Sequence, residues 1–267
     1  MTPRSRRPGP APKKSFGQNF LISPAVRDRI VRACDVRDSD TVVEIGPGKG
    51  VLSKPLAGQA GRLFLVEKDP RMADYLRQEL AGQPVTISQT DILTYALPPG
   101  EKIILVGNIP YNISTPIVEY AIAHRSRIRT FFLTVQREFG ERLAAAPGNK
   151  IYGSLSVFAQ FYAEIKVLFS IKRTAFFPVP KVDSCFVRMD FRSPRFRLPD
   201  ESRFFRFVQQ TFTQRRKTLI NALPYAGAKE ELRNKLCACR IKPEARAETL
   251  SIEDFVRIFR QIDEAGN

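Results

Sequence analysis

The sequence predicts an α/β fold in which a mostly parallel sheet is followed by a small all-helical domain. Short apolar runs alternate with segments of helical periodicity up to about residue 165, as expected for strands joined by crossover helices. Two further strand-like runs follow with no clear helix between them, which indicates an antiparallel end to the sheet. Beyond residue 200 the apolar spacing is helical throughout.

The composition limits the classes of protein to which this chain can belong. Its 267 residues accommodate one larger domain and a small appended one, and 43% hydrophobic residues suffice for a sizeable core. No run approaches the roughly 18 apolar residues of a membrane helix, and no signal peptide opens the sequence. We therefore expect a cytoplasmic protein without a membrane partner, and nothing in the sequence indicates an obligate dimer rather than a monomer.

The charge balance points to an acidic partner. The formal net charge is +16, from 43 Lys and Arg against 27 Asp and Glu. A basic, solvated surface is the simplest explanation. At this magnitude we favour nucleic acid, because neutralising phosphates releases counterions and drives binding.

Histidine and cysteine usage argues against a metal site. The single histidine, His124, follows an apolar helical run and is interpreted as a helix-end residue. The four cysteines have no recognised zinc or redox spacing and are expected to be free thiols. No metal is therefore expected.

The chain divides into three predicted parts. Residues 1–13 form a basic, proline-rich flexible arm, residues 14–192 the sheet domain, and residues 201–267 the helical domain. A mitochondrial transit peptide is the alternative interpretation of the arm, but its prolines interrupt an amphipathic helix. The predicted strands are Thr41–Ile45, Arg62–Val66, Val85–Ser88, Ile103–Val106 and Thr130–Val135, with Ile165–Ile171 and Cys185–Phe191 in the antiparallel part.

A glycine-rich turn, residues 44–50 (EIGPGKG), follows the first of these strands and precedes a helix. Glycines let the backbone approach a ligand closely, and the helix start offers free N–H groups. The dinucleotide fingerprint would require glycine at position 51, where Val51 stands. The spacing beginning at Gly46 is instead typical of S-adenosylmethionine sites.

Two acidic residues follow the next strands. Glu67 lies 21 positions after Gly46, a distance at which a carboxylate can accept both ribose hydroxyls. Asp91 is placed to accept the adenine amine of the same cofactor, and Ile92 to pack on its ring. The alternatives are a surface carboxylate for Glu67 and a helix cap for Asp91.

The most specific pattern, residues 107–112 (GNIPYN), follows the apolar strand KIILV directly. It resembles the motif with which adenine and cytosine methyltransferases methylate amines. The Asn108 side-chain oxygen and a backbone carbonyl near Pro110 can accept the two N–H groups of an adenine amine, aiming its lone pair at a methyl group. Tyr111 can stack on the flipped base. A proline turn with a core tyrosine is the structural alternative.

A proline-stiffened loop, residues 176–184 (FFPVPKVDS), offers a second aromatic wall, with Phe176 closing the base pocket opposite Tyr111. Aromatic residues in loops also often serve only to fill a core.

Taken together, these motifs resemble the ribosomal RNA adenine N6,N6-dimethyltransferases, specifically those acting on the small subunit. The resemblance runs from Lys14 to about Ile262 and includes residues 14–21 (KSFGQNFL), 42–53, 66–69, 90–93, 107–114, 136–143 and 176–184. It implies a Rossmann-like S-adenosylmethionine-dependent methyltransferase sheet. It also implies that S-adenosyl-L-methionine is the methyl donor.

The resemblance further implies the site and the substrate. The implied cofactor site comprises Asn19, Leu21, Gly46, Glu67, Asp91 and Asn108, while Asn108, Tyr111 and Phe176 shape the adenine pocket. The implied partner is the small-subunit precursor, in which two adjacent adenosines of the 3′-terminal hairpin of 16S rRNA each receive two methyl groups. Two alternatives remain: a large-subunit rRNA methylase, and an assembly factor whose methylation is dispensable.

The C-terminal residues Arg215, Arg216 and Lys217 lie within QRRKTLINAL, a stretch resembling the small-subunit enzymes. We expect them to bind rRNA phosphates and so to position the RNA, while the base pocket selects adenine. A solvated helix face is the alternative.

Overall fold

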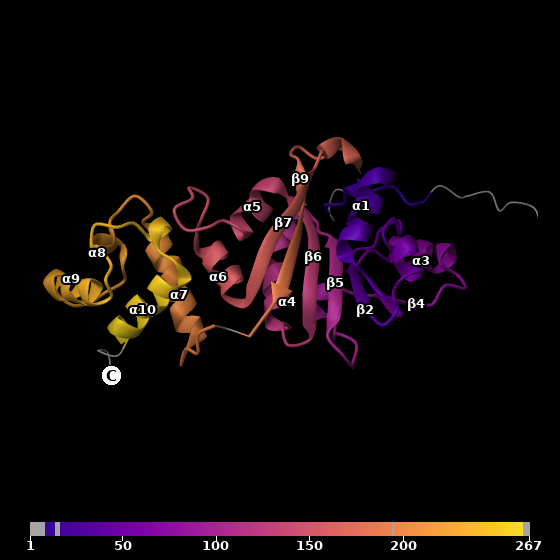
Figure 1. Cartoon of the computed structure of the whole chain (residues 1–267). Coiled ribbons are helices and arrows are strands. Elements are labelled where there is room, and N and C mark those ends of the chain that lie inside the picture. The colour runs from indigo at the N-terminus through magenta and orange to yellow at the C-terminus, as the bar shows by residue number, and fades with distance from the viewer. Residues whose placement is uncertain (1–8, 14–16, 194, 264–267) are drawn as a thin grey trace, which may run out of the picture. The chain divides into compact units, whose positions relative to one another are not determined.

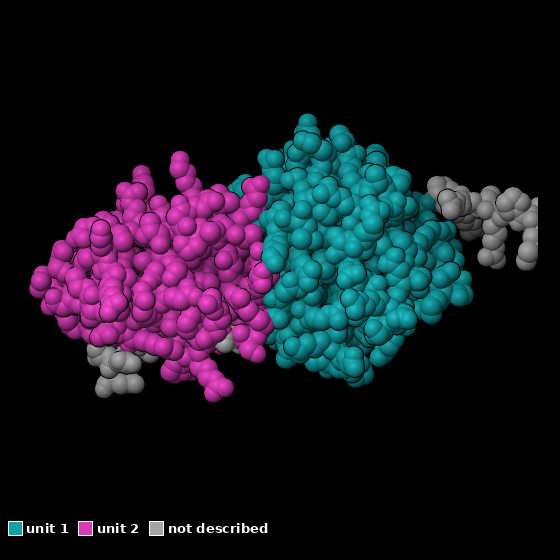
Figure 2. All heavy atoms as spheres, in the orientation of Figure 1, with its two compact units in different colours: residues 1–140, 166–191 teal, residues 141–165, 192–267 magenta. Residues whose placement is uncertain are grey.

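The computed structural model describes residues 9–13, 17–193 and 195–263, so residues 1–8 of the predicted arm and the start of the KSFGQNFL motif lie outside the described residues. Figure 1 shows two groups of elements along the chain. The described chain divides into two compact units, residues 1–140 with 166–191, and residues 141–165 with 192–267 (Figure 2).

The first unit contains a seven-stranded sheet in the order β4-β3-β2-β5-β6-β9-β7 and a two-stranded ribbon of β1 and β8. The strands are β1 (Phe20–Leu21), β2 (Thr41–Ile45), β3 (Arg62–Glu67), β4 (Val85–Gln89), β5 (Ile103–Asn108), β6 (Ile128–Gln136), β7 (Ala163–Ile171), β8 (Phe176–Phe177) and β9 (Ser184–Phe191). The pairs β2–β3, β3–β4, β2–β5 and β5–β6 are parallel, whereas β6–β9 is antiparallel. The predicted fold class, including the antiparallel end, is confirmed.

Helices follow the strands as the alternation predicts. They are α1 (Pro24–Cys34), α2 (Ser53–Ala57), α3 (Pro70–Glu79), α4 (Ser114–Ala123) and α5 (Arg137–Leu143), with short 3-10 turns η2 (Ile92–Thr94), η3 (Tyr111–Ile113) and η4 (Arg173–Ala175). Ser23 caps α1 by accepting a hydrogen bond from the backbone N–H of Val26, and Pro24 occupies its first turn. His124 is the C-cap of α4, which confirms its interpretation as a helix-end residue.

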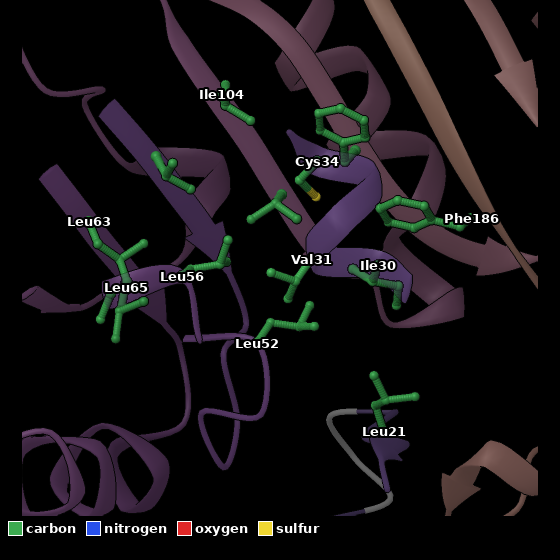
Figure 3. Close-up of a cluster of buried hydrophobic side chains, with 14 of the residues drawn as sticks. Leu21, Ile30, Val31, Cys34, Leu52, Leu56, Leu63, Leu65, Ile104 and Phe186 are labelled. Carbon is green, nitrogen blue, oxygen red and sulfur yellow. The ribbon is translucent and has the colours of Figure 1, made fainter. Parts of the chain in front are cut away.

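One face of the sheet packs against α1. Ile30, Val31 and Cys34 of this helix lie against strand residues that include Ile104 and Phe186 (Figure 3). The central strand β2 is buried on both faces from Val42 to Ile45, as expected for a parallel sheet covered on both sides. The free-thiol prediction is also confirmed: Cys34, Cys185 and Cys239 are buried and Cys237 is exposed.

The second unit has an aromatic core. Its helices are α6 (Ser154–Tyr162), α7 (Glu201–Thr213), α8 (Leu219–Ala222), α9 (Lys229–Ala238) and α10 (Ile252–Asp263), with the 3-10 turn η5 (Ala247–Thr249). The apolar residues that predicted α7, namely Phe204, Phe207, Val208 and Phe212, are all buried. The ring centroids of Phe204 and Phe259 lie 5.4 Å apart, and those of Phe212 and Phe255 lie 5.5 Å apart.

The unit boundary differs from the predicted domain boundary in one respect. Residues 141–165, which include the end of α5 and the start of β7, belong to the sheet domain by sequence order but to the helical unit by contact. The reason is that α6 packs on α7. The ring centroids of Phe161 in α6 and Phe204 in α7 lie 5.6 Å apart, and the Tyr162 hydroxyl donates a hydrogen bond to Glu201 Oε2 at 2.5 Å. No helix among the described residues is long and apolar enough to span a membrane.

Candidate active site

A cavity lies at the carboxyl edge of the sheet in the first unit. Residues that follow β2, β3, β4 and β5 line it, together with the segment 17–20 that leads into β1. The strand order reverses between β2 and β5, and this switch point is where α/β sheets bind ligands.

The glycine turn after β2 shapes the floor of the cavity. Gly46, Gly48 and Gly50 have φ angles of +59°, +56° and +71°, a region that side chains other than glycine rarely adopt. A Cβ built on Gly46 would meet no atom within 4 Å, so glycine keeps that part of the cavity open for a ligand. A Cβ on Gly48 would lie 2.9 Å from the ring of Phe20. The predicted role of Gly46 as a close-approach position therefore fits this geometry.

Glu67 lies at the end of β3, is 5% exposed and lines the cavity. Its Oε2 accepts the backbone N–H of Gly48 at 3.0 Å, and its Oε1 accepts that of Asp69 at 2.8 Å. Burial raises the pKa of Glu67, and the backbone N–H groups of Asp69, Gly48 and Lys68 oppose the shift. A carboxylate has about four acceptor positions, so one stays available for a hydroxyl group.

Asp91 and Ile92 line the next part of the cavity, after β4. One Asp91 oxygen accepts the N–H of Leu93 and caps η2, which is the structural role considered for it, and the other accepts Lys68 Nζ at 2.7 Å. This bond with Lys68 lowers the pKa of Asp91, so its side chain is a carboxylate at neutral pH. Ile92 is buried at the cavity wall, as its packing role requires.

Asn108 ends β5 and faces the N-terminal segment. Its Nδ2 donates to the backbone carbonyl of Asn19 at 2.8 Å, which fixes the orientation of the amide. Among the described residues, nothing donates to Asn108 Oδ1. The side chain therefore presents a hydrogen-bond acceptor at the cavity, as the adenine-amine hypothesis requires.

Pro110 and Tyr111 form the next stretch of the wall. The Tyr111 hydroxyl shares a 2.7 Å hydrogen bond with Ser184 Oγ, which ties the ring to β9. Burial raises the pKa of Tyr111, so its hydroxyl is neutral at physiological pH. The Pro110 carbonyl accepts the N–H of Ile113 at 3.1 Å and, more weakly, the Ser114 hydroxyl at 3.5 Å.

Phe176 and Leu21 do not line the cavity. Both belong to the hydrophobic core, with exposures of 1% and 4%, and they face each other across the β1–β8 ribbon. In this arrangement neither side chain forms a wall of the cavity. Their roles toward base and cofactor stay predictions.

The three predicted RNA-binding residues of the second unit differ from one another. Arg215 Nη2 donates to the carbonyls of Lys150 and Tyr152 at 2.6 and 3.0 Å, so this guanidinium is engaged within the unit. Arg216 and Lys217 are exposed, and their side chains make no hydrogen bond or ion pair within the described chain. These two are the better candidates for phosphate contacts.

The structure adds residues that the sequence interpretation missed. Gln18 lines the cavity and donates to the buried Asp69 at 3.2 Å, which anchors the N-terminal segment beside Glu67. Glu44, 2% exposed, accepts the Ser53 hydroxyl at 2.6 Å beneath the glycine turn. Burial raises the pKa of Glu44 to about 8. A charged residue inside the apolar run VVEI is the sequence signal that identifies it.

Comparisons with known proteins bear on the chemistry of this cavity. Residues 11–264 match the family described as ribosomal RNA adenine dimethylase. The ribosomal RNA small subunit methyltransferase A of Moorella thermoacetica is 39% identical, covering 96% of this chain and 94% of that protein.

Two solved structures are also similar over 92% of this chain. A dimethyladenosine transferase from Plasmodium falciparum superposes with a TM-score of 0.81 at 25% identity, covering 98% of that chain. The 23S rRNA methyltransferase ErmE gives a TM-score of 0.74 at 29% identity, covering all of that chain. Within the described residues no group of three or more His, Cys, Asp or Glu side chains is placed to hold a metal ion.

Proposed function

Because this chain belongs to the ribosomal RNA adenine dimethylase family, we propose that it transfers methyl groups from S-adenosyl-L-methionine to the N6 atoms of two adjacent adenosines in the 3′-terminal hairpin of 16S rRNA. Each adenosine receives two methyl groups, and the substrate is the small ribosomal subunit during its assembly. The observation that carries this proposal is the orientation of Asn108, whose amide nitrogen is held by the Asn19 carbonyl and whose oxygen is left for the substrate.

The donor supplies an electrophilic methyl group, and the residues after β2, β3 and β4 fit its binding. Glu67 has an acceptor position left for a ribose hydroxyl, while Asp91 and Ile92 offer an acceptor and an apolar surface for the adenine. The open space over Gly46 admits a ligand close to the backbone. Asn19 and Gln18 close this end of the cavity from the N-terminal segment.

The residues after β5 fit the base that is methylated. An adenine amine is a weak nucleophile because its lone pair is delocalised into the ring. Asn108 Oδ1 accepts one of its N–H groups and so directs the lone pair toward the methyl group. Tyr111 stacks on the extruded base, and its ring face favours the positive charge that develops on the nitrogen.

The choice of the small subunit rests on relatives and on the C-terminal sequence. The Moorella protein is named for the small subunit, and the QRRKTLINAL stretch at 214–223 resembles that group. ErmE, a 23S rRNA methyltransferase, has a similar fold, so the fold itself does not discriminate between the two substrates. Arg216 and Lys217 would contact phosphates of the substrate RNA, and the protein would act as a monomer in the cytoplasm.

The test is transfer of a labelled methyl group to unmethylated small subunits, followed by digestion and chromatography of the nucleosides. We expect N6,N6-dimethyladenosine at up to four methyl groups per subunit, and no incorporation with Asn108→Ala. Labelling of protein-free large-subunit RNA in place of small subunits would assign the 23S reaction. Absence of label in both RNAs, with small-subunit binding retained, would indicate an assembly factor.

A further inference from the structure

Exposed apolar side chains are concentrated beside the active site. Within the described residues, six large hydrophobic side chains are substantially exposed. Four of them, Ile22, Phe177, Val179 and Val182, belong to the end of β1, to β8 and to the loop that follows β8, with exposures of 57%, 57%, 56% and 45%. Apolar groups gathered in this way on a surface mark a binding site more often than chance exposure.

The pairing of β1 with β8 determines which aromatic ring faces outward. Leu21 pairs with Phe176 and Phe20 with Phe177, and directly opposed residues share a face of an antiparallel ribbon. The Leu21–Phe176 face is buried in the core, so Phe20 and Phe177 occupy the other face. Phe20 lines the cavity. The exposed ring of Phe177 is therefore one strand, or about 5 Å between Cα atoms, from the cavity wall.

Ile22 extends the same face. Side chains alternate along a strand, so Ile22 shares a face with Phe20, and its backbone N–H donates to the Ala175 carbonyl at 2.8 Å in continuation of the ribbon. In this register Ile22 and Phe177 are diagonal neighbours, close enough for their side chains to form one apolar surface.

The loop around Phe177 is basic and held in place. Residues 172–184 contain three cations, Lys172, Arg173 and Lys181, and one acidic residue, Asp183. Asp183 closes the base of the loop, because its Oδ1 accepts the backbone N–H of Arg173 at 2.9 Å. The next residue, Ser184, binds the Tyr111 hydroxyl. The loop is thus connected directly to the ring proposed to stack on the target base.

An exposed aromatic ring flanked by cations is the arrangement with which proteins bind unpaired nucleotides. We propose that Phe177, together with Ile22, stacks on an unpaired base that neighbours the target adenosine, while Lys172 and Lys181 contact the adjoining phosphates. This inference rests on the proposed function and assigns a second base-binding position to the same site. RNA fits this surface better than a protein partner does, since cations precede and follow the ring in the same loop and the ring adjoins the base pocket.

Phe177→Trp provides a direct test, because the sequence contains no tryptophan and the variant carries a single reporter. The variant is titrated with a protein-free fragment of 16S rRNA containing the 3′-terminal hairpin. We expect strong quenching of the tryptophan emission and protection from acrylamide. Val167→Trp, at a 37% exposed position on β7, is the matched control and should not respond. A response of the Phe177→Trp variant that requires ribosomal proteins and is absent with RNA alone would overturn the proposal in favour of a protein contact.

Kinetics separate stacking from general apolar contact. Phe177→Ala should raise the KM for small subunits by about 5- to 150-fold, the range for losing one base–aromatic stack, and leave the affinity for S-adenosylmethionine unchanged. Phe177→Trp should restore the KM, and Phe177→Leu should not. A wild-type KM in Phe177→Ala, or full rescue by leucine, would refute the assignment. Failure of the proposed function would appear differently, as absence of methyl transfer in the wild-type protein while the fluorescence response persists.

Discussion

The cavity of the first unit and the basic surface of the second hold their polar groups in opposite ways. Glu67, Asp91 and Asn108 are each bound to a protein partner before any ligand arrives. Arg216 and Lys217 are exposed and make no such bonds within the described chain. Selection of one base requires acceptors held at fixed positions, whereas contact with phosphates tolerates long, mobile side chains.

This contrast predicts how substitutions act. A change in the cavity alters one defined step by a large factor, since an oriented group is lost or a buried partner is left unpaired. A change on the basic surface weakens RNA binding modestly and in a salt-dependent manner. The following experiments test that difference.

The largest effect is expected at Glu44, the buried carboxyl beneath the glycine turn. Its pKa is raised to about 8 in the folded protein, so the folded state binds more protons than the unfolded state between about pH 4.5 and 8. The contribution of Glu44 to stability is therefore present at low pH and lost as the pH rises through that window. Each unit of pKa shift corresponds to about 1.4 kcal/mol.

We expect Glu44→Gln, which cannot ionise, to abolish this loss of stability. Urea unfolding of wild type and variant at pH 6 and pH 9 measures it, and the variant should gain a few kcal/mol relative to wild type at the higher pH. If the free energies of unfolding of wild type and variant differed by the same amount at pH 6 and pH 9, the pKa of Glu44 would not be raised by folding.

The next largest effect is expected from removing the NH2 group of the Asn108 side chain, which donates to the Asn19 carbonyl. Asn108→Asp keeps an acceptor but places a carboxylate oxygen against the Asn19 carbonyl, where the amide donates at 2.8 Å. We expect kcat/KM for methyl transfer to fall by about 100-fold, because two acceptors then face each other in a partly buried position. Steady-state kinetics on small subunits measure this, and a rate within threefold of wild type would show that the Asn19 contact is not needed.

A smaller loss is expected for cofactor binding in Glu67→Gln. The two N–H groups of Gly48 and Asp69 bind different oxygens of Glu67, so one of them would face the NH2 group of the glutamine. This mismatch and the loss of the charge should raise the Kd for S-adenosylmethionine by about 10-fold. Calorimetry measures the Kd. Asp74→Asn, at an exposed position of α3, is the control and should bind normally. An unchanged Kd in Glu67→Gln would remove Glu67 from the cofactor site.

The smallest effects belong to the second unit. The double variant Arg216→Ala with Lys217→Ala should weaken RNA binding by about 10-fold and reduce the slope of log K against log salt by roughly 1 to 2. Arg215→Ala should instead lower the melting temperature, because its guanidinium holds the carbonyls of Lys150 and Tyr152. If Arg215→Ala changed the slope of log K against log salt and left the melting temperature unchanged, Arg215 would be an RNA-binding residue rather than a structural one.

The strands, their alternation with helices and the motifs that follow each strand could be predicted from the amino-acid sequence alone. These features are local: apolar runs, glycines with positive φ, and the residues at strand ends. Since parallel strands present their carboxyl ends at one edge, the meeting of Gly46, Glu67, Asp91 and Asn108 could also be predicted. The ionisable Glu44 was visible within an apolar run but not interpreted.

Features that depend on contacts between distant segments could be seen only in the folded chain. The pairing of β1 with β8 buried Phe176 and exposed Phe177, although both are adjacent phenylalanines in one motif. Packing of α6 on α7 assigned residues 141–165 to the helical unit, and the carbonyls of that segment engaged Arg215 but not Arg216. Phe176 and Phe177 are identical residue types at adjacent positions, and so are Arg215 and Arg216. Their environments differ because segments that are distant in the sequence bury Phe176 and bind Arg215 but not their neighbours.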